Sequence, residues 1–398
     1  MADDSLATQA LHADNNLDGE SDITPPIHLS TTFRYLYNND QDESPPGPAA
    51  CHPTPFPHPP YKNTKAQILT NRAPTRTRLE TVLSALIRGP TLTYASGLAA
   101  VHAYLVFLKP KRIAIGHGYY GSRQVASLHQ QLTGCEILGF DQLDELQEGD
   151  VIHLETPINP TGEALSIRRF ADEAHKRGAY LVIDSTFGPP GLQDPFALGA
   201  DIIMHSGTKY FGGHHDLLCG TLSITPAREE AWFKALHEQR TILGSVLGGM
   251  EVWLGLRSLR TLELRVQRQS ENATGLVRWL DGCLKSESDN VVKQTVAAVR
   301  HASLQEGDMD WLREQMPHGF GPVFAIEMRT EEMSRRLTGL LRLFQHATSL
   351  GGVESQIEWR RLVDGSAKPT LLRVSIGVEY LEDLKRDLLQ GFDALIKD

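Results

Sequence analysis

Long apolar runs are absent from the 398-residue sequence, and no stretch of about 18 consecutive apolar residues could form a membrane span. Basic residues are in the minority, since 39 Lys and Arg face 49 Asp and Glu and give a net charge of -10. This balance argues against a nucleic-acid partner, because phosphate contacts need clustered positive charge. The acidic residues 1–5 lack the basic-then-apolar order of a signal peptide, so we expect a cytoplasmic protein without a membrane partner.

Cysteine is scarce as well. The four cysteines lie far apart with no C-x-x-C pair, so neither a zinc site nor a disulfide framework is indicated. Residues 214–216 read HHD, but adjacent histidines cannot easily share one ion, and we expect no metal. The cysteines are Cys51, Cys135, Cys219 and Cys283.

Short apolar runs alternate with amphipathic segments between about residues 90 and 225, which predicts an α/β fold with a largely parallel sheet covered on both faces. Beyond residue 254, a long helical pattern leads into an α+β segment. The predicted strands are Leu92–Tyr94, Ile113–Ile115, Val151–Leu154, Tyr180–Ile183, Ile202–Met204, Leu222–Ile224, Val323–Met328 and Leu371–Ile376. The predicted helices start at Arg72, with Pro74 near the first turn, and cover Leu98–Leu108, Gly121–Leu132, Ile167–Lys176, a stretch after Leu259, and Leu381–Ile396.

The length suits two domains. We expect an N-terminal arm and loop over residues 1–60, a larger domain over 61–256 and a smaller α+β domain over 257–398. Proline is dense in residues 44–61, which excludes a helix or an interior strand there. This loop is either a solvated linker or the lining of a substrate channel.

One lysine is placed for chemistry. Residues 205–216 read HSGTKYFGGHHD and follow the apolar strand Ile202–Met204, so Lys209 lies just past the carboxyl end of a parallel strand, where α/β sheets gather their sites. Desolvation and nearby cations can keep such an amine neutral, which makes it a nucleophile toward an aldehyde cofactor. Ser206 and Thr208 add the small hydroxyl groups that a phosphate needs.

That string resembles the Schiff-base signature of the trans-sulfuration family, the pyridoxal-phosphate enzymes of cysteine and methionine metabolism that include cystathionine synthases and lyases. The family reads roughly HSATKYIxGHSD, so this chain differs at minor positions. Further motifs that are similar to the family's, in the family's order, lie at residues 23–33, 96–100, 119–122, 155–160, 184–187, 349–355 and 372–379.

The resemblance implies a fold-type I pyridoxal-phosphate-dependent transferase, with a mostly parallel seven-stranded-type sheet in a cofactor-binding domain. It implies pyridoxal 5'-phosphate as the cofactor, a small amino acid as the substrate, and a homodimer or homotetramer in which the N-terminal arm reaches over a neighbouring subunit.

The resemblance also implies roles for single residues. Lys209 would carry the cofactor and then remove the α-proton, with Tyr120 stacking on the cofactor ring and Asp184 keeping its pyridine nitrogen protonated. Asn159 would contact the phenolic oxygen. Taken alone, each has a commoner use, such as core packing for a tyrosine, a turn for Asn-Pro and a cap for a strand-end aspartate. The implied cofactor-binding residues are Ser96, Gly97, Leu98, Tyr120, Asn159, Asp184, Ser206, Thr208 and Lys209.

Substrate binding is implied for Arg373, Ser349 and Asn159. Arg373 lies on an apolar strand, so its charge needs a partner, and a substrate carboxylate fits its planar fork. The alternative is an internal ion pair with Glu379 or another acid.

The family's Y-x-R phosphate clamp is missing, because counting back from Pro74 puts Ile68 and Thr70 at its two places. Tyr61 and Arg72 are candidates to replace it.

The expected reaction is Cγ elimination and replacement on an O-activated homoserine, as in cystathionine gamma-synthases. Thr348 stands where synthases and γ-lyases of the family tend to have Glu, and Leu350 stands where bacterial β-lyases have Trp. One alternative is β- or γ-elimination from cystathionine or a related thioether. Another is a weakly active or non-catalytic member that serves as a partner-binding subunit.

Overall fold

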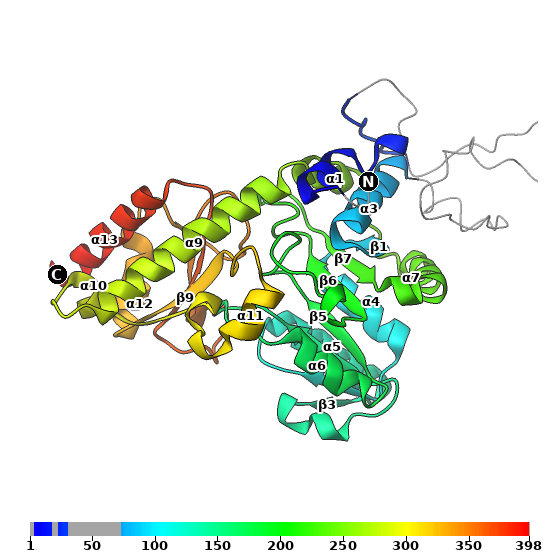
Figure 1. The fold of residues 1–398 in the computed structure, drawn as a ribbon, viewed down its shortest axis with the longest axis horizontal. Helices are drawn as coiled ribbons and strands as arrows, with labels where there is room; N and C mark the ends of the chain where they lie inside the picture. The colour runs from blue at the N-terminus through cyan, green and yellow to red at the C-terminus, as the bar shows by residue number, and fades with distance from the viewer. Residues whose placement is uncertain (1–3, 18–22, 31–72, 398) are drawn as a thin grey trace, which may run out of the picture.

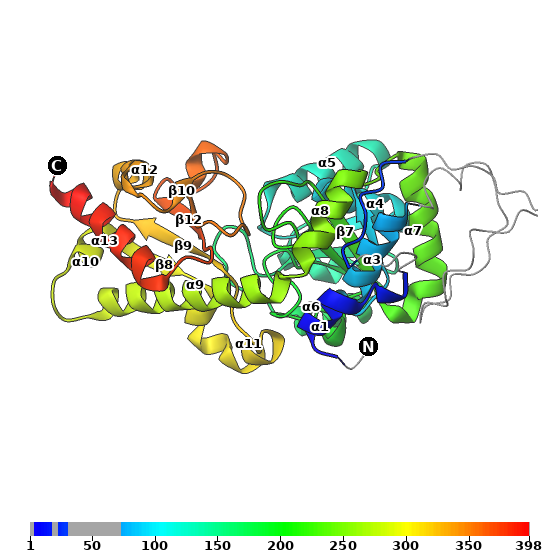
Figure 2. The same ribbon diagram turned by 90° about the horizontal axis from the view of Figure 1, so that it is seen from above.

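The computed structural model describes residues 4–17, 23–30 and 73–397. The Pro-rich segment 44–61, with Cys51 and both clamp candidates, Tyr61 and Arg72, lies outside the described residues. Figures 1 and 2 show two lobes side by side, with the long helix α9 (Leu262–Lys285) running from one to the other. The described N-terminal helix α1 (Leu6–His12) packs on the larger lobe, and the C-terminus lies at the far end of the smaller lobe (Figures 1 and 2).

The larger lobe is built on a seven-stranded sheet in the order β1-β7-β6-β5-β4-β2-β3. Its strands are β1 (Thr91–Tyr94), β2 (Arg112–Ile115), β3 (Glu136–Leu138), β4 (Val151–Glu155), β5 (Tyr180–Asp184), β6 (Ile202–Ser206) and β7 (Gly220–Ile224). Its helices are α1 (Leu6–His12), α3 (Pro74–Ile87), α4 (Gly97–Leu108), α5 (Tyr120–Thr133), α6 (Ile167–His175), α7 (Glu229–Leu243) and α8 (Gly249–Leu259). The strands predicted here from apolar runs are all present, and α3 begins at Pro74, two residues after the predicted start at Arg72, with the proline in its first turn.

Strands β3, β2, β4, β5 and β6 are parallel, whereas β7 runs antiparallel between β6 and β1. An antiparallel neighbour needs no crossover helix, so the loop 207–219 can lead directly from β6 into β7. That loop carries Lys209.

Apolar side chains of the inner strands point alternately to the two faces of this sheet, so both faces pack against helices. Val182, Ile202 and Met204 pack with α4, α5 and α7, while Ile183 and Ile203 pack with α3, α6 and α8. Because both faces are covered, the inner strands β4, β5 and β6 are almost entirely apolar up to their carboxyl ends.

The smaller lobe has a five-stranded sheet in the order β10-β11-β12-β9-β8. Its strands are β8 (Val296–Arg300), β9 (Val323–Met328), β10 (Gln345–His346), β11 (Gln356–Trp359) and β12 (Leu371–Ser375). Besides α9, its helices are α10 (Val291–Thr295), α11 (Met309–Gln315), α12 (Glu331–Leu340) and α13 (Leu381–Lys397).

One face of this second sheet packs its apolar residues against α9, α10, α12 and α13. Ile357, Leu372 and Val374 belong to that core, so the residues between them, Glu358 and Arg373, point to the opposite face. The domain limit predicted near residue 257 falls inside α8 and stays a prediction. None of the described helices is long and apolar enough to cross a membrane.

Candidate active site

Three neighbouring strands of the large sheet end in polar residues. Glu155 at the end of β4 lies opposite Asp184 at the end of β5, and β6 ends at Ser206. Since these strands are parallel, their carboxyl ends share one edge of the sheet, which is where α/β folds bind ligands. Lys209 follows β6 at the same edge.

A short hydrogen-bond chain fixes Asp184. The backbone N–H and the hydroxyl of Thr186 donate to Oδ1 of Asp184, at 3.0 and 2.5 Å, and the Thr186 hydroxyl oxygen accepts the backbone N–H of Ser206 at 2.9 Å. Burial raises the pKa of Asp184, although the Thr186 donors and Lys209 oppose that shift. Oδ2 has no hydrogen bond within the described ranges, so this oxygen is available to a ligand.

Lys209 and Ser349 meet across 140 residues of chain. The Lys209 Nζ donates to the Ser349 Oγ at 2.8 Å. Burial and the positive charge of Arg373 lower the pKa of Lys209 to about 8, against the opposing charges of Glu358 and Asp184. The structure therefore gives Lys209 the partly neutral amine that a nucleophile requires.

Ser349 lies in a loop that packs on the backbone of Lys209. Its φ of +75° lies in the left-handed region, which is uncommon for a residue with a side chain and is often found at functional sites. The loop continues into Gly351, where an added Cβ would lie only 2.9 Å from the Lys209 carbonyl carbon. Only a glycine there lets the two segments approach so closely.

The start of α4 forms a cradle of backbone amides beside Ser206. The Ser96 Oγ caps the helix by accepting the Ala99 N–H at 3.1 Å, which leaves first-turn amides at Gly97 and Leu98 without intrahelical acceptors. A Cβ on Gly97 would lie 3.2 Å from the Ser206 Cβ. Such a helix N-terminus fits a phosphate group. Thr208 lies nearby in sequence, but its hydroxyl is already paired with the backbone of Cys219.

Arg373 has internal partners. Its Nη1 donates to Oδ1 of Asn159 at 3.2 Å, and its Nη2 donates to the Ser349 carbonyl at 2.7 Å. Its ion pair is with Glu358, 2.7 Å from Nη2, and not with Glu379, which accepts hydrogen bonds from Ser355. Burial lowers the pKa of Arg373 to about 10. The structure therefore brings the three proposed substrate-binding residues together, with Arg373 in direct contact with both Asn159 and Ser349.

Two adjacent tyrosines open α5. Tyr120 is 37% exposed, and its ring centroid lies 5.0 Å from that of Tyr119. Burial and a hydrogen bond with Tyr120 raise the pKa of Tyr119, while the charges of Arg360 and Arg373 lower it. Tyr119, which the sequence prediction passed over in favour of Tyr120, thus lies within electrostatic reach of the arginines of the site.

Glu155 is a second residue whose part the sequence did not predict. Its two oxygens accept the backbone N–H groups of Tyr119 and Asn159, each at 2.6 Å, so it holds two loops of the site together. Burial and the Asp184 carboxylate raise the pKa of Glu155 to about 8. The motif at 155–160 contained this signal, because a carboxylate ending a buried strand needs donors.

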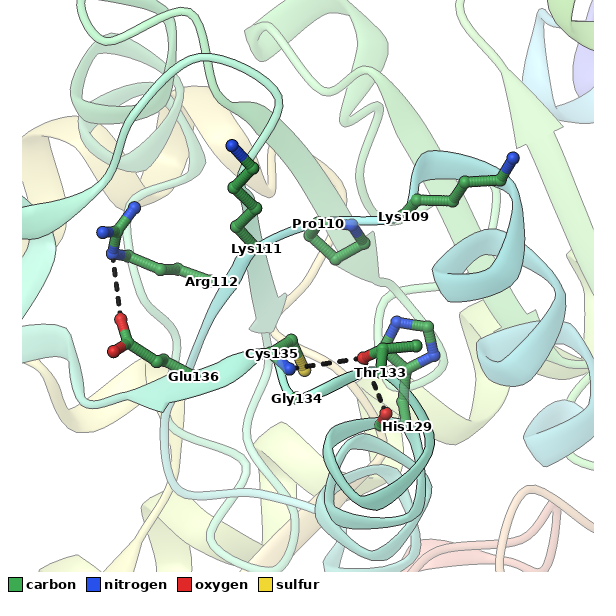
Figure 3. A pocket seen from close by; sticks show the side chains of 9 residues that line it. All are labelled: Lys109, Pro110, Lys111, Arg112, His129, Thr133, Gly134, Cys135 and Glu136. Carbon is green, nitrogen blue, oxygen red and sulfur yellow. Dashed lines mark hydrogen bonds and ion pairs between the residues drawn. The ribbon is translucent and has the colours of Figure 1, made fainter.

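A separate pocket lies at the opposite end of the large sheet. Figure 3 shows Lys109 and Lys111 before β2, and Cys135 and Glu136 at the start of β3. Helices α4 and α5 end here, at caps Lys109 and Gly134, so cations near their negative termini are explained by the helix dipoles. This pocket lies at the amino ends of the strands, away from Lys209.

The histidine pair near Lys209 is engaged elsewhere. The His214 Nδ1 lies 2.8 Å from the Gly212 carbonyl, and the His215 Nε2 lies 3.3 Å from a Glu354 oxygen. Among the described residues, no group of three His, Cys, Asp or Glu side chains could hold a metal ion.

The family model for Cys/Met metabolism PLP-dependent enzymes matches residues 7–393. The chain belongs to this family. Cystathionine gamma-synthase of Escherichia coli (strain K12) is 32% identical over 401 residues, 94% of each chain. Cystathionine beta-lyase of Lactococcus lactis subsp. cremoris is 31% identical over 341 residues, 80% of this chain and 86% of that one. The crystal structure of apo CalE6, a methionine gamma lyase from Micromonospora echinospora, superposes on this chain with a TM-score of 0.80 and 30% sequence identity. The match covers 98% of this chain and 100% of that one.

Membership identifies the chain as a pyridoxal-phosphate-dependent enzyme of the fold predicted from its sequence. The residues present fit this cofactor. The amides of the α4 start and Ser206 suit its phosphate, Lys209 suits its aldehyde, and the unpaired oxygen of Asp184 suits its ring nitrogen.

Proposed function

We propose that this enzyme catalyses Cγ elimination and replacement on an O-activated homoserine, as a cystathionine gamma-synthase does. Membership in the family and relatives named as synthases and as lyases support the broader activity, which is pyridoxal-phosphate chemistry on a sulfur-metabolism amino acid. The synthase of Escherichia coli aligns with 94% of this chain.

The state of Lys209 carries the proposal. Loss of a leaving group from Cγ requires protons to be moved at both Cα and Cβ, so one base must serve two positions. The Lys209 amine has a pKa near 8 and, among the residues that the structure describes, makes a single hydrogen bond, to Ser349. Because the Lys209 side chain is long and its amine is held by one hydrogen bond, the amine can move between Cα and Cβ of the substrate.

Each remaining side chain has a proposed task. Pyridoxal phosphate bound at this site would supply an electron sink for the charge that deprotonation leaves at Cα. Asp184 would hold the proton on the ring nitrogen, and Tyr120 would pack against the ring. The guanidinium of Arg373, with Asn159 and Ser349, orients the α-carboxylate. The amides of residues 96–98, with Ser206, hold the phosphate, whereas the Thr208 hydroxyl, predicted for this role, is paired with the Cys219 backbone instead.

Thr348 stands where synthases and γ-lyases of the family alike tend to have Glu, so this position disfavours cystathionine as a substrate but does not by itself favour the synthase reaction. The side chain is exposed and uncharged, so the position before Ser349 offers no carboxylate to the distal ammonium group of cystathionine. The acyl group of an O-activated homoserine ester carries no ammonium group and needs no such partner.

The test is a substrate panel on the purified holoenzyme. We expect O-acetylhomoserine with cysteine to give cystathionine and acetate, and O-acetylhomoserine alone to give 2-oxobutanoate, acetate and ammonia. Turnover of cystathionine alone, with the ester unused, would replace the proposal with a lyase. A normal cofactor spectrum without turnover of any sulfur amino acid would favour the non-catalytic alternative.

We also propose that the enzyme is a cytoplasmic homodimer or homotetramer. The arm motif at residues 23–33 supports an oligomer, because its counterpart in the family reaches over a neighbouring subunit. Light scattering after gel filtration tests this, and a monomer at micromolar concentration would contradict it.

A further inference from the structure

Three charged side chains form one buried cluster behind the proposed carboxylate site. A single oxygen of Glu358, Oε2, lies 2.7 Å from Nη2 of Arg373 and 2.5 Å from Nη1 of Arg360. The side chains of Glu358, Arg373 and Arg360 are 4%, 5% and 7% exposed, respectively. Two guanidinium groups therefore share one carboxylate.

The strand register explains this meeting. Glu358 on β11 lies directly opposite Arg373 on β12, so both side chains leave the same face of the sheet. Arg360 comes two residues after Glu358 in the turn that follows β11. The charges of Arg360 and Arg373 both lower the pKa of Tyr119, so both arginines lie within electrostatic reach of that tyrosine.

Arg360 changes the net charge of the cluster that it forms with Glu358 and Arg373. An isolated Glu358–Arg373 pair would be neutral, and its carboxylate would compete with any substrate carboxylate for the guanidinium. With Arg360 on the same oxygen, the cluster keeps one net positive charge. Arg373 can then still attract an anion, while Asn159 and the Ser349 carbonyl hold its guanidinium in place.

We propose that Arg360 is a positioning residue that offsets Glu358, so that Arg373 binds the α-carboxylate of the substrate with a full positive charge. This inference rests on the proposed role of Arg373 in substrate binding. Contacts of Arg373 with Asn159 and the Ser349 carbonyl keep its plane fixed, so the effect of Arg360 is on charge and not on the location of Arg373.

The experiment measures binding of norleucine, an amino acid without a leaving group, from the change in visible absorbance of the holoenzyme. We expect Arg360→Gln to weaken binding about 10-fold or more. Arg360→Lys keeps the charge and should stay within about 3-fold of the wild type. Arg361→Gln is the matched control, since Arg361 is an exposed neighbour that contacts backbone carbonyls.

The decisive variant is the double change Glu358→Gln with Arg360→Gln. It removes the competing carboxylate together with the balancing cation, so affinity should return to near the wild-type value. A merely structural role for Arg360 predicts that the double variant binds no better than Arg360→Gln, and this result would overturn the inference. Unchanged norleucine affinity in Arg360→Gln would overturn it as well.

Norleucine separates the two proposals. If the ester is not turned over but the affinities follow the expected order, the proposed reaction fails and the role of Arg360 stands. If the ester is turned over and Arg360→Gln binds norleucine normally, the role of Arg360 fails alone. Arg373→Gln should weaken norleucine binding more than any of these variants, and normal binding by it would remove the basis of the inference.

Discussion

The lowered pKa of Lys209 predicts how the apoenzyme takes up its cofactor. Only the neutral amine attacks an aldehyde, so covalent attachment of pyridoxal phosphate should follow the deprotonation of Lys209. Burial and Arg373 lower this pKa from 10.5 to about 8. A folded-state pKa below the ordinary value means that the neutral form is already present at lower pH.

The size of the effect follows from these two values. At pH 7, a pKa of about 8 leaves about one-tenth of the amine neutral, whereas a pKa of 10.5 leaves about one molecule in 3,000. Lys209 therefore has about 300 times more reactive amine than an ordinary surface lysine. The attachment rate should rise through about pH 8 and level off above about pH 9.

The assay mixes apoenzyme with pyridoxal phosphate at pH 6 to 11 and fixes the attached cofactor by borohydride reduction. Peptide mapping then reports attachment at position 209, and Lys209→Ala gives the background from other lysines. A rate at this position that keeps rising with a midpoint above about pH 10 would refute the reasoning, since it would mean that the amine is neither desolvated nor under the influence of Arg373.

Three further predictions concern the cradle, the ring-nitrogen partner and the smaller core. Gly97→Ala places a Cβ 3.2 Å from that of Ser206 and should weaken the affinity for the cofactor about 10-fold, measured by equilibrium dialysis. The control Gly282→Ala, with no atom within 4 Å of the new Cβ, should leave the affinity for the cofactor unchanged. Equal affinities in the two variants would contradict a phosphate cradle at Gly97. Asp184→Asn keeps an oxygen for the Thr186 donors but removes the charge, so kcat should fall about 100-fold or more while the cofactor stays bound; a kcat near that of the wild type would exclude the proposed role. Leu276→Ala, in the core of the smaller lobe, should lower the free energy of unfolding by about 2–5 kcal/mol, measured by denaturant unfolding. Leu264 is 70% exposed on the same helix, so Leu264→Ala should lower it by less than about 0.5 kcal/mol. Similar losses in the two variants would mean that α9 is not packed as described.

Local patterns predicted most of the large sheet. The apolar runs that form β4, β5 and β6 are bounded by turn residues and separated by amphipathic segments, and these signals depend on a few neighbouring residues. The antiparallel direction of β7 was not predicted, because strand direction depends on which strands pair. β11 was also missed, since its residues are half polar and give no apolar run.

The sequence by itself predicted the cofactor, through motifs that resemble those of the pyridoxal-phosphate family. Lys209, Asp184 and the start of α4 lie at strand ends, and the ends of parallel strands gather at one edge of a sheet, so their order along the chain also predicted that they lie together. The tertiary structure alone decided the partners of these groups. Two contacts join segments that are distant in sequence or depend on strand register. They are the hydrogen bond from Lys209 to Ser349 and the sharing of Glu358 by Arg373 and Arg360. The Lys209–Ser349 contact depends on the packing of one lobe on the other, and the Glu358 cluster depends on the pairing of β11 with β12, so no local pattern encodes either.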